Sequence, residues 1–279
     1  MLDAVRRRVW RLLFQPAQSQ LGSFFIDPQD HIGAERLIMG ERYEEIYLQQ
    51  LERLIEVLDL QKGLAIDAGA NIGNHACWFV ARFAHLICFE PGKVAGLILE
   101  ANLLKTGTKN WQIFKCALGA ENGYGKLAVV NEMNLGSCQV VSVSNMQAEF
   151  EVLRGDEALL RANVTGAETP VTLIKIDVEG GELSVLKGFR QAIEKYSPLI
   201  CIEALDEAQW RLAREFLERC GYVFFMAPTV THSSGSLLSH AVTLAAGKRL
   251  GMSEVSGVFP AGGYGMIFCL NSEKLSMLQ

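Results

Sequence analysis

Residues 63–79 constrain the fold of this chain more than any other stretch. A short apolar run at 64–66 ends on Asp67, and glycines follow at positions 69 and 73. Apolar residues then recur at helical spacing. This order predicts a buried strand, a tight turn and the start of a helix. Glycine in such a turn adopts positive φ and lets a ligand approach the backbone closely.

The turn has the spacing Asp-x-Gly-x-x-x-Gly and lacks the middle glycine of the dinucleotide pattern Gly-x-Gly-x-x-Gly. Without that glycine the backbone is less suited to a pyrophosphate. An acid at the strand end instead favours a ligand with a positive group, such as S-adenosylmethionine. We expect Asp67 to bind the ammonium group, directly or through water, and the turn and helix start to hold the carboxylate. A plain strand–turn–helix corner is the alternative. The predicted cofactor contacts of this segment are Asp67, Gly69, Ala70, Asn71, Ile72 and Gly73.

A second apolar run at 85–89 also ends on an acid, Glu90, which lies 23 positions after Asp67. This separation fits strand, helix, strand, and ligands of parallel sheets lie beyond the carboxyl ends of the strands. We therefore expect Glu90, with Pro91 beside it, to contact the cofactor. Its carboxylate would accept both ribose hydroxyls, at roughly 1.5–3 kcal/mol for each charge-assisted hydrogen bond. A surface acid is the alternative. A third strand at 111–116 would bring Cys116 and Ala117 beside the adenine.

Acidic residues crowd the end of the strand predicted at 171–176, where Asp177 is followed by Glu179 and Glu182. Crowded carboxylates raise one another's pKa, which suits a general base. Their oxygens also suit Mg²⁺, whose involvement we leave open. For Glu182 the alternative is the simpler role of complementing a helix N-terminus, and for Lys175 it is that of neutralising a neighbour.

A further strand at 198–203 ends on Glu203, another acid at the same predicted edge. We expect the general base to be among Asp177, Glu179 and Glu203, and Asp177 also to contact the cofactor. The metal ligands, if the protein uses a metal, are not predicted.

The three segments together resemble the FkbM family of S-adenosylmethionine-dependent methyltransferases. The resemblance lies in Ile-Asp-Ala-Gly-Ala-Asn-Ile-Gly at 66–73, Phe-Glu-Pro at 89–91 and Ile-Lys-Ile-Asp-Val-Glu-Gly-Gly-Glu at 174–182, and spans residues 25–203. It implies a class I methyltransferase that methylates a hydroxyl of a sugar, glycolipid or polyketide-type small molecule. Family members often have an aromatic after the second glycine, where this chain has Asn74 and His75. His75 is therefore a candidate site residue, with helix packing as the alternative.

The resemblance implies a Rossmann-like α/β fold, with a seven-stranded, mostly parallel sheet whose last strand is antiparallel and with helices on both faces. We assign 1–22 to a basic amphipathic helix and linker, and 23–279 to the methyltransferase domain. The helix would rest on an anionic membrane surface or pack on the domain or a partner. Residues 228–263, with His232 and His240, are expected to form a lid or substrate-recognition segment.

Several remaining elements follow from periodicity. Apolar spacing predicts an amphipathic helix over 43–58 at the sheet edge, with Tyr43 as a candidate substrate contact. Alternating segments at 124–130 and 139–143 predict a hairpin, and 149–162 is weakly helical or a connection. Strands are expected at 222–226 and 265–270, the second one antiparallel.

Charge and cysteine usage narrow the functional classes. A net charge of −5 argues against a general nucleic-acid surface. Seven cysteines without a C-x-x-C pair favour a reducing compartment, so we expect a cytoplasmic protein, with peripheral contact to a membrane's inner face left open. No apolar run has the length of a membrane span. The expected partner is a small-molecule or glycan hydroxyl compound, and the oligomeric state is left open. The alternatives are an NAD-dependent oxidoreductase and a non-catalytic cofactor-binding or membrane-associated scaffold.

Overall fold

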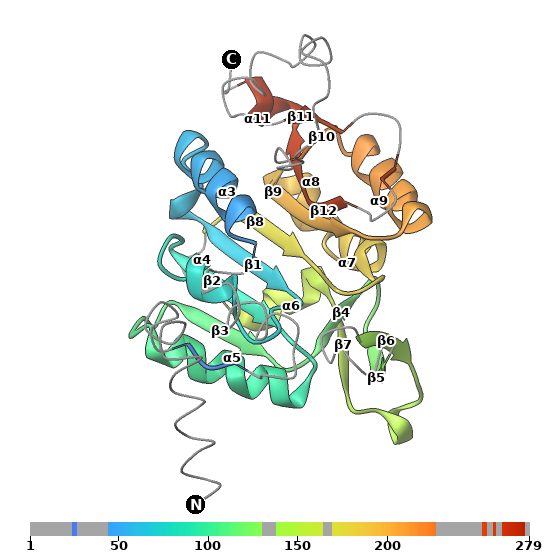
Figure 1. Ribbon diagram of the computed structural model, residues 1–279. Coiled ribbons are helices and arrows are strands. Elements are labelled where there is room, and N and C mark those ends of the chain that lie inside the picture. The colour runs from blue at the N-terminus through green and yellow to red at the C-terminus, as the bar shows by residue number, and fades with distance from the viewer. Residues whose placement is uncertain are drawn as a thin grey trace, which may run out of the picture.

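A twisted, mostly parallel sheet forms the centre of the molecule (Figure 1). The computed structural model describes residues 24–26, 44–129, 138–163, 169–226, 253–255, 259–260 and 264–276. The strand order is β11-β10-β12-β9-β8-β1-β2-β3. The strands are β1 (Leu64–Ala68), β2 (His85–Phe89), β3 (Trp111–Phe114), β8 (Val171–Ile176), β9 (Leu199–Ala204), β10 (Tyr222–Met226), β11 (Ser253–Glu254) and β12 (Tyr264–Asn271).

The direction of β12 confirms the predicted topology. It runs antiparallel to both β9 and β10, whereas β3, β2, β1, β8 and β9 pair in parallel. The expected seven strands are thus present, and the two-residue β11 adds a short antiparallel edge beside β10.

Helices cover both faces of this sheet and divide its core into two layers (Figure 1). One layer holds α3, α4 and α5, and the other holds α6, α7, α8 and α9. Their bounds are α3 (Glu45–Val57), α4 (Ala76–Phe79), α5 (Lys93–Lys105), α6 (Gly155–Ala162), α7 (Glu182–Gly188), α8 (Arg190–Tyr196) and α9 (Glu207–Arg219). A 3-10 turn, η1 (Leu60–Lys62), joins α3 to β1, and α11 (Ser272–Ser276) follows β12.

Strand alternation decides where the chemically active side chains point. In β1, Ile66 packs in the layer of α6 to α9, whereas Ala65 packs in the layer of α3 to α5. Because successive residues of a strand point to opposite faces, Asp67 falls on the α3 side. The same alternation in β8 and β9 places Lys175 and Glu203 on that side. Three strand ends therefore present their ionisable groups to one face.

A second sheet with the order β4-β7-β5-β6 lies beside the first (Figure 1). It contains β4 (Ala117–Gly119), β5 (Gly123–Val129), β6 (Cys138–Ser142) and β7 (Phe150–Arg154), with η2 (Asn145–Gln147) between β6 and β7. The antiparallel pairing of β5 with β6 confirms the predicted hairpin. The weakly helical reading of 149–162 was wrong for its first part, because β7 pairs with β4 and only α6 is helical.

Three further expectations need correction. The helix after the glycine turn spans only Ala76–Phe79. The third strand ends at Phe114, so Cys116 lies in the link to β4. Helix α3 does not lie at the sheet edge: its apolar side chains share a layer with residues of the central strands, such as Leu173 of β8 and Leu199 of β9.

Several predictions fall outside the described residues. These are the helix and linker at 1–22, Tyr43, both loop histidines and most of 228–263. No helix in the described ranges is long and apolar enough to cross a membrane. The described cysteines form no disulfide with one another; they are at positions 77, 88, 116, 201, 220 and 269.

Candidate active site

The two signature turns, after β1 and after β8, pack backbone against backbone. The Asp177 amide donates to the Ala68 carbonyl at 3.1 Å. Gly69 has φ 78, and a Cβ on it would overlap the Asp177 carbonyl oxygen. Glycine alone both adopts this positive φ readily and leaves room for the Asp177 carbonyl. The turn after β1 and the turn after β8, each of which predicted a site on its own, are therefore parts of one structural unit.

Lys175 links these two turns from inside the sheet. Its side chain is 3 % exposed, and its Nζ lies 3.1 Å from Asp67 Oδ1 and 3.1 Å from Asp177 Oδ2. The same nitrogen donates to the Gly69 carbonyl at 3.0 Å. Burial opposes the charge on Lys175, but Asp177 and Asp67 overcome that effect and raise its pKa. The simpler role considered for Lys175, neutralising a neighbour, thus applies to two carboxylates at once.

Asp67 lies at 0 % exposure beneath the turn. Its carboxylate does not reach the surface, so a direct contact with a ligand ammonium, as expected above, does not fit this geometry. Its partner Lys175 holds the Gly69 carbonyl instead. We therefore propose an indirect role for Asp67, in which it fixes Lys175 and, through it, the backbone of the turn.

Asp177 and Glu203 form a carboxylic acid–carboxylate pair at the ends of β8 and β9. They share a side-chain hydrogen bond. Burial and the neighbouring Asp177 charge raise the pKa of Glu203 to about 10. Burial also disfavours the Asp177 charge, but Lys175 and the hydrogen bond from Glu203 lower the pKa of Asp177 below its usual value. At neutral pH Asp177 is therefore the ionised member and Glu203 the proton donor.

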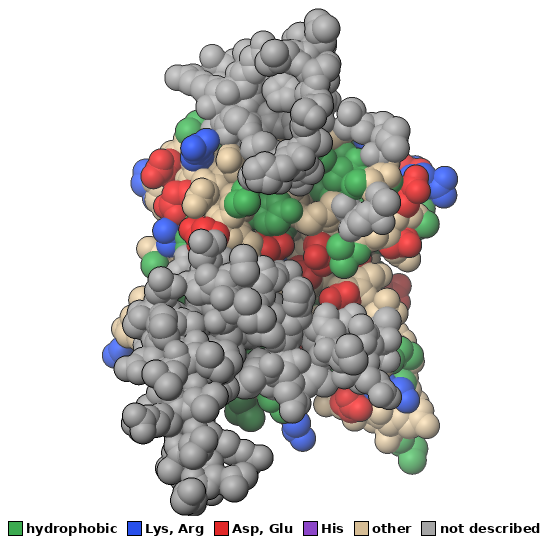
Figure 2. All heavy atoms as spheres, viewed as in Figure 1, with side chains coloured by type: hydrophobic (Ala, Val, Ile, Leu, Met, Phe, Trp, Pro, Cys, Tyr) green, Lys and Arg blue, Asp and Glu red, His purple; other side chains and the backbone are tan. Residues whose placement is uncertain are grey.

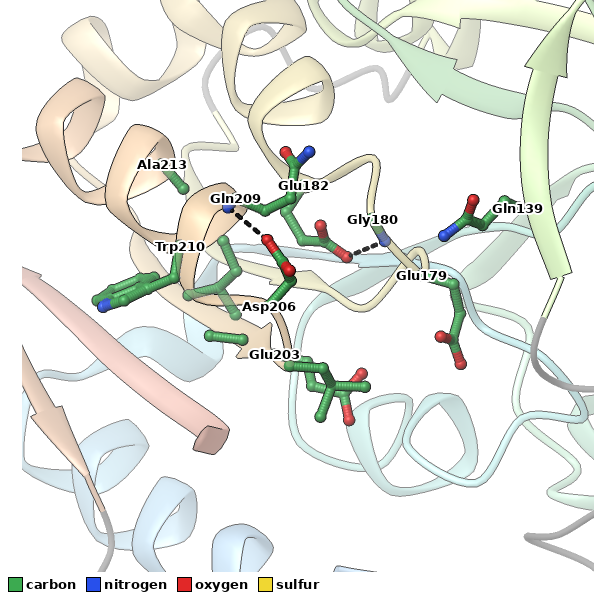
Figure 3. Close-up of a pocket in the computed structure, with 12 residues that line it drawn as sticks. Gln139, Glu179, Gly180, Glu182, Glu203, Asp206, Gln209, Trp210 and Ala213 are labelled. Atoms are coloured by element: carbon green, nitrogen blue, oxygen red, sulfur yellow. Dashed lines mark hydrogen bonds between the residues drawn. The ribbon is translucent and has the colours of Figure 1, made fainter. Parts of the chain in front are cut away.

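Glu179 projects from a strained position in the next turn. Its φ is 53, and Gly180 after it has φ 98. Burial and the Asp177 charge raise the pKa of Glu179 to about 7. Figure 3 shows Glu182 folded back on the Gly180 amide, its hydrogen-bond donor at 2.8 Å, while the Glu179 carboxylate points away from it. This contact fits the alternative role given for Glu182, which was to complement the start of α7. The Glu179 carboxylate takes no part in that contact.

Glu90 lies at the end of β2 with 8 % exposure. Its two carboxylate oxygens accept from the Asn71 amide at 2.8 Å and from the Gly92 amide at 2.6 Å. Burial raises the pKa of Glu90 to about 7, although the two hydrogen bonds act to lower it. Each oxygen retains a second lone pair, so the contact with ribose hydroxyls remains a proposal. Pro91 lies between Glu90 and Gly92, whose amide holds this carboxylate.

The backbone amides of the glycine turn are largely engaged. Those of Gly69 and Ala70 donate to the Phe89 carbonyl, that of Asn71 donates to Glu90, and that of Gly73 donates to the Ala70 carbonyl. The predicted role of these four amides in holding a carboxylate does not fit these bonds. Ile72 has its carbonyl engaged by Asn102 at 2.8 Å. The two glycines of the turn serve packing, because a Cβ would meet the Asp177 carbonyl at Gly69 and the Leu99 side chain at Gly73.

His75 contacts the site by pairing with Glu44, a residue that was not predicted to belong to the site. Its Nε2 lies 3.1 Å from Glu44 Oε2, and the two side chains are 7 % and 10 % exposed. Glu44 immediately precedes α3 with φ 58 and contributes to the raised pKa of Glu203. No local signal pointed to Glu44, because it pairs with a residue 31 positions away.

Cys116 and Ala117, the predicted adenine neighbours, are both 4 % exposed in the layer of α6 to α9. Ala117 is in β4 and pairs with Val152. Burial raises the pKa of Cys116 to about 12, so its thiol is protonated at neutral pH. The adenine contact remains a prediction for both residues.

An open pocket lies beside the acidic pair (Figure 3). Its cavity volume is about 110 Å³, which is smaller than the about 300–1,000 Å³ of sites that bury a drug-sized ligand. Glu179 and Glu203 line it, and α9 and β6 contribute further side chains. In Figure 2 acidic side chains lie across the middle of the visible face, whereas Lys and Arg lie toward its margins. Among the described residues no group of three or more His, Cys, Asp or Glu is placed to hold a metal ion.

A family model described as the methyltransferase FkbM domain matches residues 67–224, more than half of the chain. The chain belongs to the FkbM methyltransferase family. The match begins at Asp67 and ends in β10, so this family's domain includes the β1, β2, β8 and β9 ends described above.

Individual relatives of this FkbM-family chain are distant. The hexuronic acid methyltransferase AglP of Haloferax volcanii is 26% identical over 147 residues, covering 48% of this chain and 53% of AglP. The methyltransferase sdnD of Sordaria araneosa is 25% identical over 178 residues, covering 53% of this chain and 62% of sdnD. The matches thus span about half to three-fifths of these relatives. A crystal structure of an FkbM methyltransferase from Methylobacillus flagellatus has a TM-score of 0.46 and 16% identity, covering 94% of this chain and 60% of that one.

Proposed function

We propose that this protein is an S-adenosylmethionine-dependent O-methyltransferase that acts on a hydroxyl of a sugar, glycolipid or polyketide-type small molecule. The observation that carries the proposal is the family match over residues 67–224, which includes every strand end with a candidate site acid. The relative named for a hexuronic acid supports a sugar-type acceptor.

The strand ends suit a ligand with positive charge. S-adenosylmethionine, when bound, supplies an activated methyl group on a sulfonium. Glu90 would accept hydrogen bonds from its ribose, and the rest of the molecule would lie beside the glycine turn. The ionised Asp177 would favour the sulfonium, because opposite unit charges 4 Å apart attract by ~4 kcal/mol near a protein surface.

The acidic pair suits removal of a hydroxyl proton. As the acceptor oxygen bonds to the methyl carbon and the carbon–sulfur bond breaks, the hydroxyl proton passes to a carboxylate. We assign that role to Asp177, with Glu179 as the second candidate. Glu203, protonated, would orient Asp177 through their hydrogen bond. General base catalysis of this kind typically contributes 10²–10⁴-fold, and alignment of the reacting atoms contributes further.

Calorimetric titration of the full-length chain with S-adenosylmethionine, with NAD as the comparison, tests the cofactor. Mass spectrometry of ligand released from the purified protein provides an independent reading. Transfer of labelled methyl to a panel of hydroxyl compounds then tests the activity. Binding of NAD without binding of S-adenosylmethionine would overturn the proposal, and cofactor binding without transfer to any acceptor would favour a non-catalytic role.

A further inference from the structure

Residues from two separate parts of the fold line the pocket of Figure 3. The turn after β8 and the end of β9 bring Glu179 and Glu203 to it, and α9 brings Gln209. Gln139 reaches the same pocket from β6 of the second sheet. Its Nε2 lies 3.3 Å from the position that a Cβ on Gly180 would take, so the amide rests over the glycine turn. The hairpin that interrupts the fold thus forms one wall of the pocket.

Two carboxamides in one pocket suit hydroxyl-rich ligands. Each Gln side chain offers an oxygen that accepts and a nitrogen that donates, and each hydroxyl both donates and accepts. Gln139 and Gln209 are exposed, so their amide groups are accessible from the pocket. Apolar side chains also line the pocket, so it suits a ligand that has a carbon face as well as hydroxyls; these are Ile202, Ala204, Leu205, Trp210 and Ala213.

The charge of the lining residues disfavours acceptors that carry a negative charge. Glu179, Glu182, Glu203 and Asp206 line the pocket, whereas no Lys, Arg or His is among its described lining residues. The position of Asp206 is fixed, because its Oδ1 caps α9 by accepting from the Gln209 amide at 2.8 Å. Although Glu203 is protonated and Glu179 is only partly ionised at neutral pH, a carboxylate or phosphate on the acceptor would face the remaining carboxylate charge here without a cation to compensate it.

We propose that this pocket is the acceptor site and that it selects a neutral or amine-bearing polyhydroxyl compound over one that carries a carboxylate or phosphate. This inference rests on the proposed O-methyltransferase function. Under this proposal the chain would differ in acceptor charge from the distant relative that is named for a hexuronic acid. Both would still methylate sugar-type acceptors.

Matched sugars test the charge selection. The full-length chain is assayed with labelled S-adenosylmethionine and with methyl glycosides of a hexose, the 2-amino-2-deoxyhexose, the 6-phosphate and the hexuronic acid, each in gluco, galacto and manno configuration. We expect kcat/KM for the best neutral or amine-bearing sugar to exceed that of its uronate and phosphate by about tenfold or more. An equal or higher value for the uronate or phosphate would overturn the inference while supporting methyl transfer. Binding of S-adenosylmethionine with no sugar methylated would overturn the polyhydroxyl class, and absence of cofactor binding would instead remove the proposed function on which it rests.

Three variants test the residues. Gln139→Ala should raise the acceptor KM about tenfold without changing the Kd for S-adenosylmethionine. Gln147→Ala is the matched control, because Gln147 lies in η2 outside the pocket lining. Asp206→Asn keeps a side chain that caps helices well but removes one charge, so it should shift the uronate-to-neutral ratio of kcat/KM toward the uronate by about three- to tenfold. Equal KM values for both Gln variants, or an unchanged ratio for Asp206→Asn, would contradict this assignment of the pocket.

Discussion

Lys175 and Asp67 are register partners on the adjacent strands β8 and β1, with Nζ 3.1 Å from Oδ1. Both are buried, so neither charge is stable without the other. Lys175→Met should therefore lower the free energy of unfolding by roughly 3–5 kcal/mol, as expected when one partner of a buried pair is removed. The double variant Asp67→Asn/Lys175→Met removes both charges of this pair and should recover part of the loss. Urea unfolding followed by circular dichroism measures both, and a single variant as stable as the wild type would contradict the pairing.

Asp177→Asn tests the proposed base. The change keeps the shape of the side chain but removes its ability to take a proton, so kcat should fall by about 10²–10⁴-fold. The Kd for S-adenosylmethionine should stay within a few-fold if Asp177 acts mainly as the base. Glu194→Gln is the control, because Glu194 pairs with Arg190 on the exposed side of α8 and is not among the pocket-lining residues. A large rise in Kd would mean that Asp177 mainly holds the cofactor, and unchanged kcat would exclude it as the base.

Glu203 should make stability depend on pH in a defined direction. Its pKa is raised to about 10, so between about pH 5 and pH 9 the folded chain keeps a proton that the unfolded chain releases. The stabilisation is complete below the unfolded pKa and is lost as pH rises toward the folded value. Relative to Glu203→Gln, which stays neutral, the wild type should therefore lose stability with rising pH, by at most about 1.4 kcal/mol per unit. Unfolding in urea at pH 5, 7 and 9 measures the difference, and parallel curves for both proteins would refute the assignment of the proton to Glu203.

Cofactor affinity should depend on Glu90. Its pKa is raised to about 7 by burial, and only the ionised form is an acceptor on both oxygens. The affinity for S-adenosylmethionine should thus increase as pH rises from 6 to 8. Glu90→Gln should remove this dependence and weaken binding by about 10- to 100-fold, the range for losing a hydrogen bond to a charged group. Calorimetry across this pH range decides, and a variant that keeps the wild-type dependence would move the ribose contact elsewhere.

The sequence predicted the strand ends well because their signals are local. An apolar run followed by an acid and a glycine turn marks each end, and parallel pairing brings such ends to one edge. It was for this reason that Asp177, Glu179 and Glu203 could be expected together before the structure was known, and they do line or adjoin one pocket.

The internal pairing could not be predicted in the same way. Asp67 suggested a ligand contact because strand-end acids usually face the ligand, but Lys175, 108 positions away, occupies its carboxylate from the neighbouring strand. In the second sheet the hairpin of β5 and β6 was predicted, but β4 and β7 were missed for a similar reason. Strand β7 is defined by pairing with β4, and its own residues give only a weak alternation.

Gly188 has a packing role that can be tested apart from catalysis. It ends α7, and a Cβ on it would overlap the Gly119 carbonyl oxygen at the end of β4. Because backbone cannot move aside as a flexible side chain can, Gly188→Ala should cost at least the roughly 1–3 kcal/mol typical of overpacking. Gly123→Ala in β5 is the matched control, since nothing lies within 4 Å of its added Cβ, and it should change stability by no more than about 0.5 kcal/mol. Thermal unfolding of both variants compares them, and equal melting temperatures would show that the junction of the two sheets is looser than these contacts require.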